Sequence, residues 1–334
     1  MKKVLKVFVA LFLVFGLVAC SNEAPKEETN SAGDKAEYTV AIIKQLDHAS
    51  LDEIANAIAA QLDALASDKG VTINYTIDSG NNDPTTLQQY AANYVADKVD
   101  CIIPIATLAA QTMVAATEGT GIPVIYAAIS DPEGAELTGL ENVSGTSDAL
   151  NTTQIMDMMF AQNSDIKKVG LLYSQSEANS QKPIAEAKAY LDEKGVEYIE
   201  ATGNTDSEVA QAVSSLIASN VEAVFTPTDN VVMATEITTA EQFITAGIAH
   251  YTGADSFVRN GGYVTCGVNY TDLGTKTADL AYEAVVSGTG NLEDYYVMDG
   301  GIITVNTETA EALGLDYTIF SEFGEIVEVQ TTEE

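Results

Sequence analysis

The sequence predicts an α/β protein made of two doubly wound, parallel-sheet lobes. Short apolar runs alternate with segments in which apolar residues recur every three or four positions, a pattern typical of strands followed by helices. This alternation repeats in both halves of the chain. About 300 residues follow the N-terminal region, which is more than one hydrophobic core usually serves. We therefore expect two lobes, each with helices on both faces of its sheet.

The first twenty residues have the pattern of an export signal. Three lysines precede an apolar run over residues 7–18, which is too short to span a bilayer as an uncleaved anchor. Leu17-Val18-Ala19-Cys20 resembles a lipobox, whose cysteine is acylated, for example with palmitate, and becomes the new N-terminus. We expect a signal peptide over 1–19, a lipidated Cys20 and a flexible tether over 20–37. The mature protein is then extracytoplasmic and lipid-anchored to the cell membrane.

The elements of the first half follow in order. Helix starts are marked twice, by Ser50 with Glu53, which match a capping box, and by Asp83 with Pro84, which match an N-cap and first-turn pair. Strands are expected at Val40–Ile43, Val71–Ile77, Cys101–Ile105 and Val124–Ala128. Helices are expected over 51–62, over 87–95 and from near Leu108.

The second half repeats the same order of elements. Strands are expected at Val169–Tyr173, Val196–Ala201 and Ala223–Thr226. Helices are expected at Pro183–Leu191, Val209–Ala218 and Val231–Phe243.

Composition excludes several classes of function. The chain has 49 acidic and 15 basic residues, a net charge of −34, which excludes binding to nucleic acid. Cys101 and Cys266 lie in apolar, strand-like runs and are expected as buried thiols. With two histidines and no glycine-rich phosphate loop or G-x-S-x-G motif, we expect no metal, no cofactor and no enzyme activity.

Polar and acidic residues follow the expected strands in both halves. Ligands bind beyond the carboxyl ends of the strands in such sheets, where helix N-termini favour anionic groups. Any one of these residues could simply cap a helix, but together they predict a site for a small polar ligand. The candidates are Gln45, His48, Thr107, Ser130, Asp131, Glu177, Asn179, Ser180, Thr228, Asp229, Asn230 and Asp255.

Seven short motifs follow one another along the chain. They are Asp47-His48-Ala49-Ser50-Leu51-Asp52, Asp97-Lys98-Val99-Asp100, Ile105-Ala106-Thr107 with Ala109-Ala110-Gln111, Ser130-Asp131-Pro132, Gly145-Thr146-Ser147-Asp148, Glu177-Ala178-Asn179-Ser180 and Pro227-Thr228-Asp229-Asn230. They stand in the order seen in a known family, and from about Tyr38 to Tyr317 the chain resembles the ABC-transporter substrate-binding lipoproteins of the tryptophan/tyrosine-binding type. One departure is Ala49, where the family usually has proline.

The resemblance implies a type I periplasmic-binding-protein fold whose lobes are joined by three crossovers and close on a ligand. The crossovers are expected near Ser147, Asp255 and Ser287. Lobe 1 would then hold residues 38–147 and 255–287, and lobe 2 residues 148–254 and 288–328. The resemblance also implies that a monomer delivers an aromatic amino acid to an ABC permease driven by its ATPase.

A zwitterionic ligand suits the candidate residues. Asp229 is the expected partner of an α-ammonium group, with Asp131 and Glu177 as alternatives. The single arginine, Arg259, is expected in a surface helix, so a carboxylate must rely on backbone N–H groups and on hydroxyls from Thr107, Ser130 or Ser180. The chain contains no tryptophan, which suits a protein that is made when tryptophan is scarce. This gives a small preference for tryptophan as the ligand, with tyrosine or phenylalanine next. Two alternatives remain open: a sugar or nucleoside ligand, and a ligand-sensing or adhesive surface lipoprotein.

Overall fold

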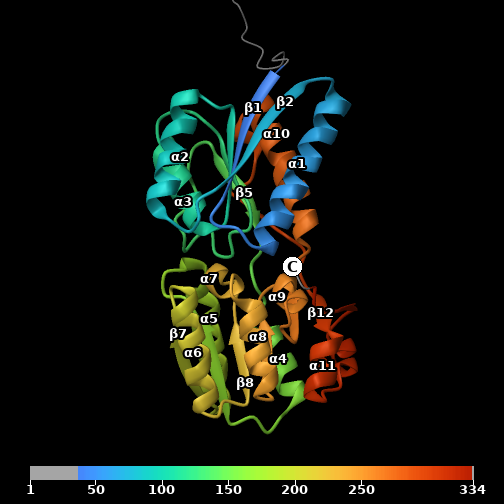
Figure 1. The fold of residues 1–334 in the computed structure, drawn as a ribbon. Helices are drawn as coiled ribbons and strands as arrows, with labels where there is room; N and C mark the ends of the chain where they lie inside the picture. Colours follow the sequence, from blue (N-terminus) through green and yellow to red (C-terminus); the bar gives the residue numbers. More distant parts are fainter. Residues whose placement is uncertain (1–36, 333–334) are drawn as a thin grey trace, which may run out of the picture. The chain divides into compact units, whose positions relative to one another are not determined.

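The computed structural model describes residues 37–332. The predicted signal peptide, the lipidated Cys20 and the tether up to residue 36 lie outside the described residues. The described chain forms one six-stranded and one seven-stranded sheet, each flanked by helices, which confirms the predicted two-lobe α/β class (Figure 1). No helix in this part of the chain is long and apolar enough to cross a membrane.

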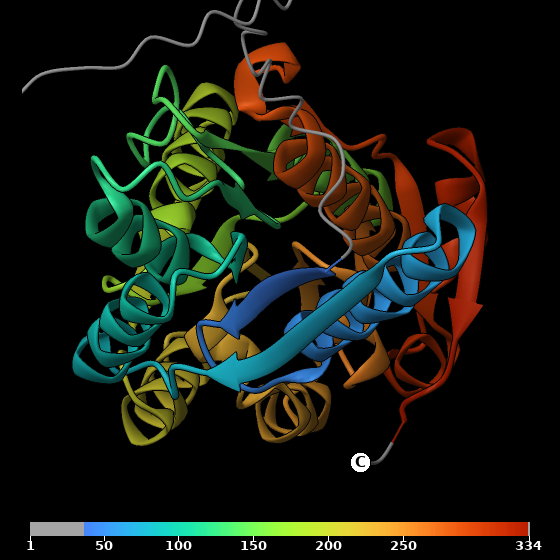
Figure 2. The same cartoon turned by 90° about the horizontal axis from the view of Figure 1, so that it is seen from above.

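Lobe 1 is a fully parallel sheet with helices on both faces. Its strands are β1 (Glu37–Lys44), β2 (Thr72–Ser79), β3 (Cys101–Ile105), β4 (Val124–Tyr126), β5 (Val143–Ser147) and β11 (Tyr296–Val297), in the order β11-β5-β4-β3-β1-β2. Figure 2 shows β1 and β2 side by side, as their parallel pairing requires. The helices form two packed pairs, α1 (Ala49–Lys69) with α10 (Tyr270–Ser287), and α2 (Pro84–Asp97) with α3 (Thr107–Thr117).

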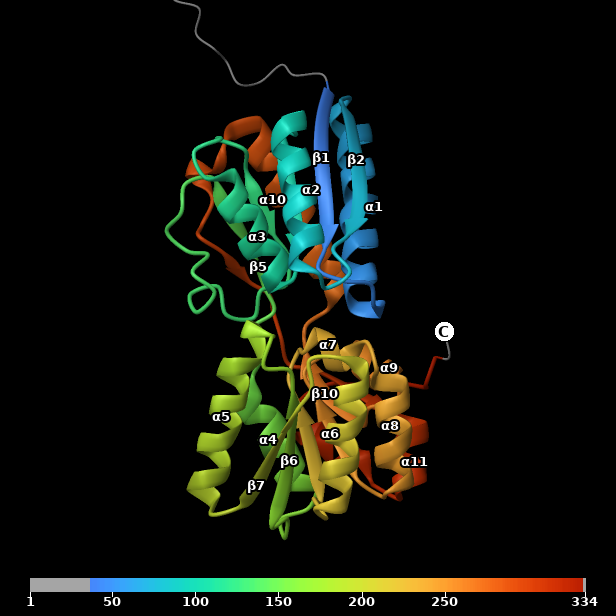
Figure 3. The same ribbon diagram turned by 60° about the vertical axis from the view of Figure 1, so that its left-hand side comes forward.

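Lobe 2 has the same construction around a mixed sheet. Its strands are β6 (Lys168–Tyr173), β7 (Glu197–Thr202), β8 (Ala223–Thr226), β9 (Ala249–Thr252), β10 (Val264–Gly267), β12 (Ile302–Asn306) and β13 (Ile326–Val329), in the order β13-β12-β10-β9-β8-β6-β7. Its helices are α4 (Thr152–Gln162), α5 (Ala178–Lys194), α6 (Asp206–Ala218), α7 (Asn230–Met233), α8 (Glu236–Thr245), α9 (Asp255–Arg259) and α11 (Thr307–Leu313). Figure 3 shows α4 and α5 on one side of this sheet and α6 and α8 on the other. Two 3₁₀ helices, Thr289–Asn291 and Tyr317–Glu322, complete the described chain.

The chain passes between the lobes at residues 148–151, 268–269 and 298–301. The second and third crossovers therefore come later than the expected positions near Asp255 and Ser287, because α9 and β10 stay in lobe 2 and β11 adds a strand to lobe 1. The chain leaves lobe 2 at the end of β10 and re-enters it at the start of β12. These neighbouring strands therefore run antiparallel, which corrects the expectation of an entirely parallel sheet.

Local signals at the helix starts were partly right. The Asp83 carboxylate accepts a hydrogen bond from Thr85 N at 2.8 Å at the start of α2, as predicted. The capping box at Ser50 was wrong, because α1 begins two residues earlier, at Ala49, and the Ser50 hydroxyl instead bonds to Ser256 in lobe 2.

The expected helix Val231–Phe243 is two helices, α7 and α8, with the Thr235 hydroxyl bonded to Val232 O at the break between them. Cys101 and Cys266 are buried free thiols, as expected.

Candidate functional site

A small, largely filled cavity lies where the carboxyl ends of strands from both lobes meet. We call it the interlobe cavity. The space open to a water-sized sphere is about 20 Å³, which is room for about one water molecule, so the lobes must separate before a larger ligand can enter. Seven of the predicted site residues line it, and the other five do not. The seven are His48, Thr107, Ser130, Asn179, Thr228, Asp229 and Asn230.

Three of the seven come from lobe 1, each at the end of a parallel strand. His48 follows β1 and stands at the N-cap position of α1, without capping it. Thr107 is the first residue of α3, so this helix begins at the cavity wall. Ser130 follows β4 and is buried. The doubly wound topology brings these three side chains together because parallel strands end at the same edge of the sheet.

The other four come from two loops of lobe 2. Asn179 lies in the first turn of α5, and its Nδ2 donates to Thr228 O at 2.7 Å. Thr228, Asp229 and Asn230 follow β8 and lead into α7. The hydrogen bond from Asn179 therefore fixes one loop against the other.

Hydrogen bonds cross the cavity from lobe to lobe. His48 Nε2 lies 3.0 Å from Asn230 Oδ1, and the Ser130 and Thr228 hydroxyl oxygens are 3.0 Å apart. Asn230 Nδ2 is already used in a bond to Glu177, so His48 Nε2 must be the donor to Asn230 Oδ1. Burial lowers the pKa of His48 to about 4, so its ring is neutral at pH 7 and Nδ1 is a bare acceptor.

Gln45 and Glu177 form a second link between the lobes, outside the cavity lining. Gln45 Nε2 donates to Glu177 Oε1 at 2.6 Å, and Asn230 Nδ2 donates to Glu177 Oε2 at 2.6 Å. Gln45 Oε1 accepts from Leu108 N at 3.0 Å, near the start of α3. Burial, followed by the charge of nearby Asp229, holds the pKa of Glu177 well above its usual range. These two candidates do not line the cavity, but they hydrogen-bond to Asn230, which does, and to the start of α3.

The remaining three candidates have partners of their own. Ser180 is buried and donates its hydroxyl to Asp229 Oδ2 at 2.7 Å. Asp131 lies at the outer rim, where its carboxylate is 3.7 Å from Lys182 Nζ of the other lobe. Asp255 pairs with Arg259 across one turn of α9 at 3.1 Å. Arg259 is on this short helix with a partly exposed side chain, as expected, and does not line the cavity.

Asp229 is fully buried, and both of its carboxylate oxygens are engaged. Oδ2 accepts from Ser174 N and from the Ser180 hydroxyl, each at 2.7 Å, and Oδ1 accepts from Val232 N at 3.0 Å as the N-cap of α7. Burial raises the pKa of Asp229, and these donors oppose that rise. The contacts are those of a structural cap; its predicted role as ammonium partner stays a prediction.

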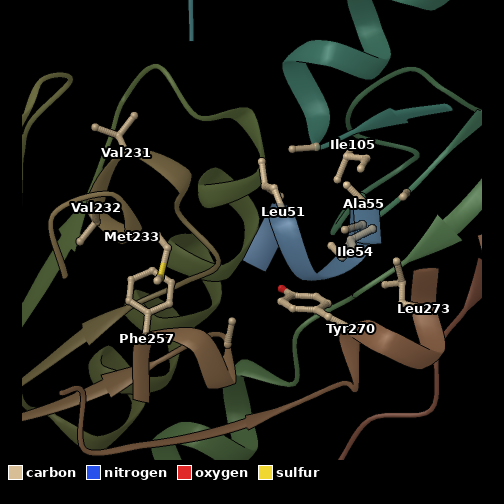
Figure 4. Close-up of a cluster of buried hydrophobic side chains, with 14 of the residues drawn as sticks. Leu51, Ile54, Ala55, Ile105, Val231, Val232, Met233, Phe257, Tyr270 and Leu273 are labelled. Carbon is tan, nitrogen blue, oxygen red and sulfur yellow. The ribbon is translucent and has the colours of Figure 1, made fainter. Parts of the chain in front are cut away.

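Several cavity residues were not among the predicted candidates. The apolar part of the wall includes Leu51, Met233, Phe257 and Tyr270. They belong to a buried cluster whose residues come from both lobes (Figure 4). Helical periodicity predicted Leu51 as a core position, but no local pattern indicates that its side chain faces a cavity. Asp148 was also missed as a ligand, although it ends the motif Gly145–Asp148 directly after β5.

Two alanines in the cavity wall have unusual backbone conformations. Ala106 has φ 76° and Ala128 has φ 56°, values that residues with a Cβ seldom adopt. They follow β3 and β4, and both line the interlobe cavity. Strained backbone of this kind costs about 1–3 kcal/mol per residue and clusters at functional sites. The strain therefore marks this edge of the sheet independently of the polar side chains.

The fold, with its two lobes, three crossovers and central cavity, is that of a type I periplasmic binding protein. Residues 39–319 match the family described as ABC transporter substrate binding protein, and the chain belongs to this family. A tyrosine-binding protein of Clostridioides difficile (strain R20291) is 29% identical over 323 residues, which cover 94% of this chain and 93% of that protein.

Two solved structures are similar at 27% sequence identity. One is an ABC domain from Streptococcus pneumonia in complex with L-Trp, with a TM-score of 0.79, covering 87% of this chain and 100% of that one. The other is the ligand-free, open structure of a substrate binding protein with adhesive properties from Clostridium difficile, with a TM-score of 0.63, covering 88% of this chain and 100% of that one.

Proposed function

We propose that this chain is the extracytoplasmic substrate-binding lipoprotein of an ABC importer and binds an aromatic L-amino acid in the interlobe cavity. The observation that carries the proposal is the composition of the cavity wall. Phe257, Tyr270, Leu51 and Met233 provide an apolar surface, and small polar groups surround it. Such a wall suits a ligand with a flat apolar side chain and a charged backbone. The named ligands of the two relatives, tyrosine and L-Trp, support the same class.

The polar groups suit the ligand's carboxylate without an arginine. Thr107 lines the cavity at the start of α3, whereas the Ser130 and Thr228 hydroxyls are already bonded to Asp148 and to each other. A helix N-terminus and hydroxyl donors can bind a carboxylate, and the helix dipole favours its negative charge. Because Arg259 pairs with Asp255 outside the cavity, neutral donors are the available partners in the described chain.

Closure of the lobes on the ligand is supported by the bonds that join them. His48 with Asn230, Ser130 with Thr228, and Gln45 with Glu177 each connect opposite walls. The TM-score is also higher with the L-Trp complex than with the open, ligand-free structure. Both observations support a closed arrangement, in which a ligand would be shielded from water.

Titration calorimetry and thermal melting of the mature domain test the ligand class. We expect tryptophan, tyrosine or phenylalanine to bind and to raise the melting temperature, because a ligand that binds only the folded state stabilises it by mass action. At 100 times Kd the gain is about 2.7 kcal/mol. All other amino acids and a set of sugars and nucleosides serve as controls. If one of these shifts the melting curve and none of the three aromatic amino acids does so at millimolar concentration, the proposed ligand class is wrong.

Adhesion is a second candidate function, favoured by the adhesive properties named for one similar structure. The two functions differ in what deletion of the gene removes. Loss of labelled amino-acid uptake supports import, whereas normal uptake with reduced attachment of cells to a surface supports adhesion.

Anchoring through Cys20 gives a separate prediction. The lipobox predicts that Cys20→Ala leaves an unprocessed precursor that no longer incorporates labelled fatty acid. Cys101→Ala is the matched control, because that thiol is buried in β3. Normal labelling of the Cys20→Ala protein would remove the basis for lipid anchoring.

A further inference from the structure

Asp148 is a buried carboxylate in the wall of the interlobe cavity. It directly follows β5, at the first crossover between the lobes, and is 5% exposed. Its Oδ1 accepts from the Ser130 hydroxyl at 2.9 Å, and its Oδ2 accepts from the Tyr270 hydroxyl at 3.1 Å. An ionised carboxylate has about four acceptor positions, so acceptor capacity remains on both oxygens.

The charge of Asp148 has no cationic partner in residues 37–332. None of the ion pairs in this range includes it, and the groups that act on its pKa are hydroxyls and backbone rather than lysine, arginine or histidine. Burial raises the pKa of this carboxyl. Burying an unpaired carboxylate is costly, and buried charges in proteins are normally paired. A cationic group on the ligand would supply the missing partner.

The other carboxylates near the cavity are already committed. Asp229 accepts three hydrogen bonds from its own lobe. Glu177 does not line the cavity, and its two oxygens accept from the side-chain amides of Gln45 and Asn230. Asp131 faces Lys182 at the rim. Of these four acids, Asp148 alone combines a place in the cavity wall with a charge that only neutral hydroxyls contact.

Two further cavity groups are acceptors without donors. Asn179 is 6% exposed and its Nδ2 is used by Thr228, so the buried atom left without a partner in the described chain is its carbonyl oxygen Oδ1. His48 Nδ1 is likewise shielded and unpartnered among the described residues. Asn179 is connected to Asp148 through Thr228 and Ser130, around the same wall. The unmatched atoms are thus acceptors, and an entering ligand has to bring donors; an ammonium group brings three.

We propose that Asp148 binds the α-ammonium group of the ligand. This inference rests on the proposed function, in which the ligand is an amino acid. It also assigns Tyr270 a positioning role, because its hydroxyl holds Asp148 from the first residue of α10. Asp148 lies at the first crossover and Tyr270 directly follows the second. Their hydrogen bond therefore connects two of the three segments about which the lobes would move, and one of its members is the residue that binds the ligand's ammonium group.

The test compares an amino acid with the same molecule lacking its amino group. Calorimetry of the mature chain would use tryptophan against indole-3-propionate, and tyrosine against 3-(4-hydroxyphenyl)propionate. The parent should prefer the amino acid. Asp148→Asn keeps the shape and removes the charge, so it should bind the amino acid at least about 30-fold more weakly while binding the analogue nearly as before. Asp229→Asn tests the competing site. Asp83→Asn, at the exposed N-cap of α2 and outside the cavity lining, is the matched control and should retain the preference.

A melting curve checks that each variant is folded. The Ser130 and Tyr270 hydroxyls can rotate to accept from an asparagine amide, so Asp148→Asn should fold; Asp148→Ser replaces it if it does not. Retention of the preference in the folded Asp148 variants overturns the proposal, and its loss in Asp229→Asn instead moves the ammonium site to Asp229.

The result also separates this inference from the proposed function. If the parent binds a non-aromatic amino acid and Asp148→Asn loses the preference over the des-amino analogue, the ligand class was wrong and the role of Asp148 stands. If the parent binds an aromatic amino acid with the preference unchanged in Asp148→Asn, the function stands and the role of Asp148 is refuted. Binding of a sugar or nucleoside instead of any amino acid refutes both.

Discussion

His250→Leu should lower the free energy of unfolding by about 3–5 kcal/mol, because it removes one partner of a buried polar pair. His250 lies in β9 in the core of lobe 2. Its Nδ1 is 2.9 Å from Glu236 Oε1, and its Nε2 is 2.8 Å from Thr226 Oγ1. The side chains of His250 and Glu236 are 2% and 0% exposed. Without the imidazole, the Glu236 carboxylate would stay buried with neither oxygen bonded to a side chain, since its Oε2 has no partner in the described chain.

Urea unfolding of parent and variants measures this effect. The double variant His250→Leu with Glu236→Leu is the control, since replacing both members of a buried pair by apolar groups is often neutral. It should recover much of the lost stability. A loss of less than 1 kcal/mol in the single variant would contradict the argument. Phe257, which lines the interlobe cavity, lies edge-on to the His250 ring at 6.4 Å, so ligand affinity of the single variant should be measured too.

Asp229→Asn should destabilise the protein by about 1–3 kcal/mol, the cost of leaving buried polar groups unsatisfied. An asparagine Oδ1 can still accept from Val232 N and cap α7. Its Nδ2 would then face Ser174 N, which is also a donor, at the place where Oδ2 now accepts at 2.7 Å. The Ser180 hydroxyl can rotate to accept, but the backbone N–H cannot.

Chemical unfolding and calorimetry of the same Asp229→Asn sample distinguish the two roles of this residue. The contacts predict a lower melting temperature together with a retained preference for the amino acid over its des-amino analogue. Normal melting with affinity reduced at least about 30-fold would instead restore Asp229 as the ammonium partner that the sequence suggested. Asp83→Asn, at the exposed N-cap of α2, is a control for loss of a charged cap alone.

Strands and helices of this chain were largely predictable because their signals are local. Cys101–Ile105 and Ala223–Thr226 are strands with the bounds that their apolar runs predict. Asp83 and Pro84 begin a helix as their residue types require. The strand-end rule then placed seven candidates in one cavity, because it depends only on parallel topology.

The remaining features depend on contacts between residues far apart in the sequence. The sequence does not show that β10 stays in lobe 2, since membership of a sheet is decided by pairing with β9 and β12. Ser50 has the residue type of a helix cap, but its hydroxyl is bonded to Ser256, which lies 206 positions later in the sequence. Asp229 and Asp148 both follow strands, yet one carboxylate is used by its own lobe and the other faces the cavity with hydroxyls alone. No local pattern distinguishes those two outcomes.

The positive φ angles of Ala106 and Ala128 lower the stability of the protein while they shape the wall of the interlobe cavity. Glycine would relax the backbone at either position, so a more stable protein is one substitution away. The same substitution would remove a methyl group from the cavity wall and let the chain sample other conformations. A gain in melting temperature at either position would therefore come with a wider and less rigid cavity wall. Engineering of this domain for thermal resistance should leave these two alanines in place.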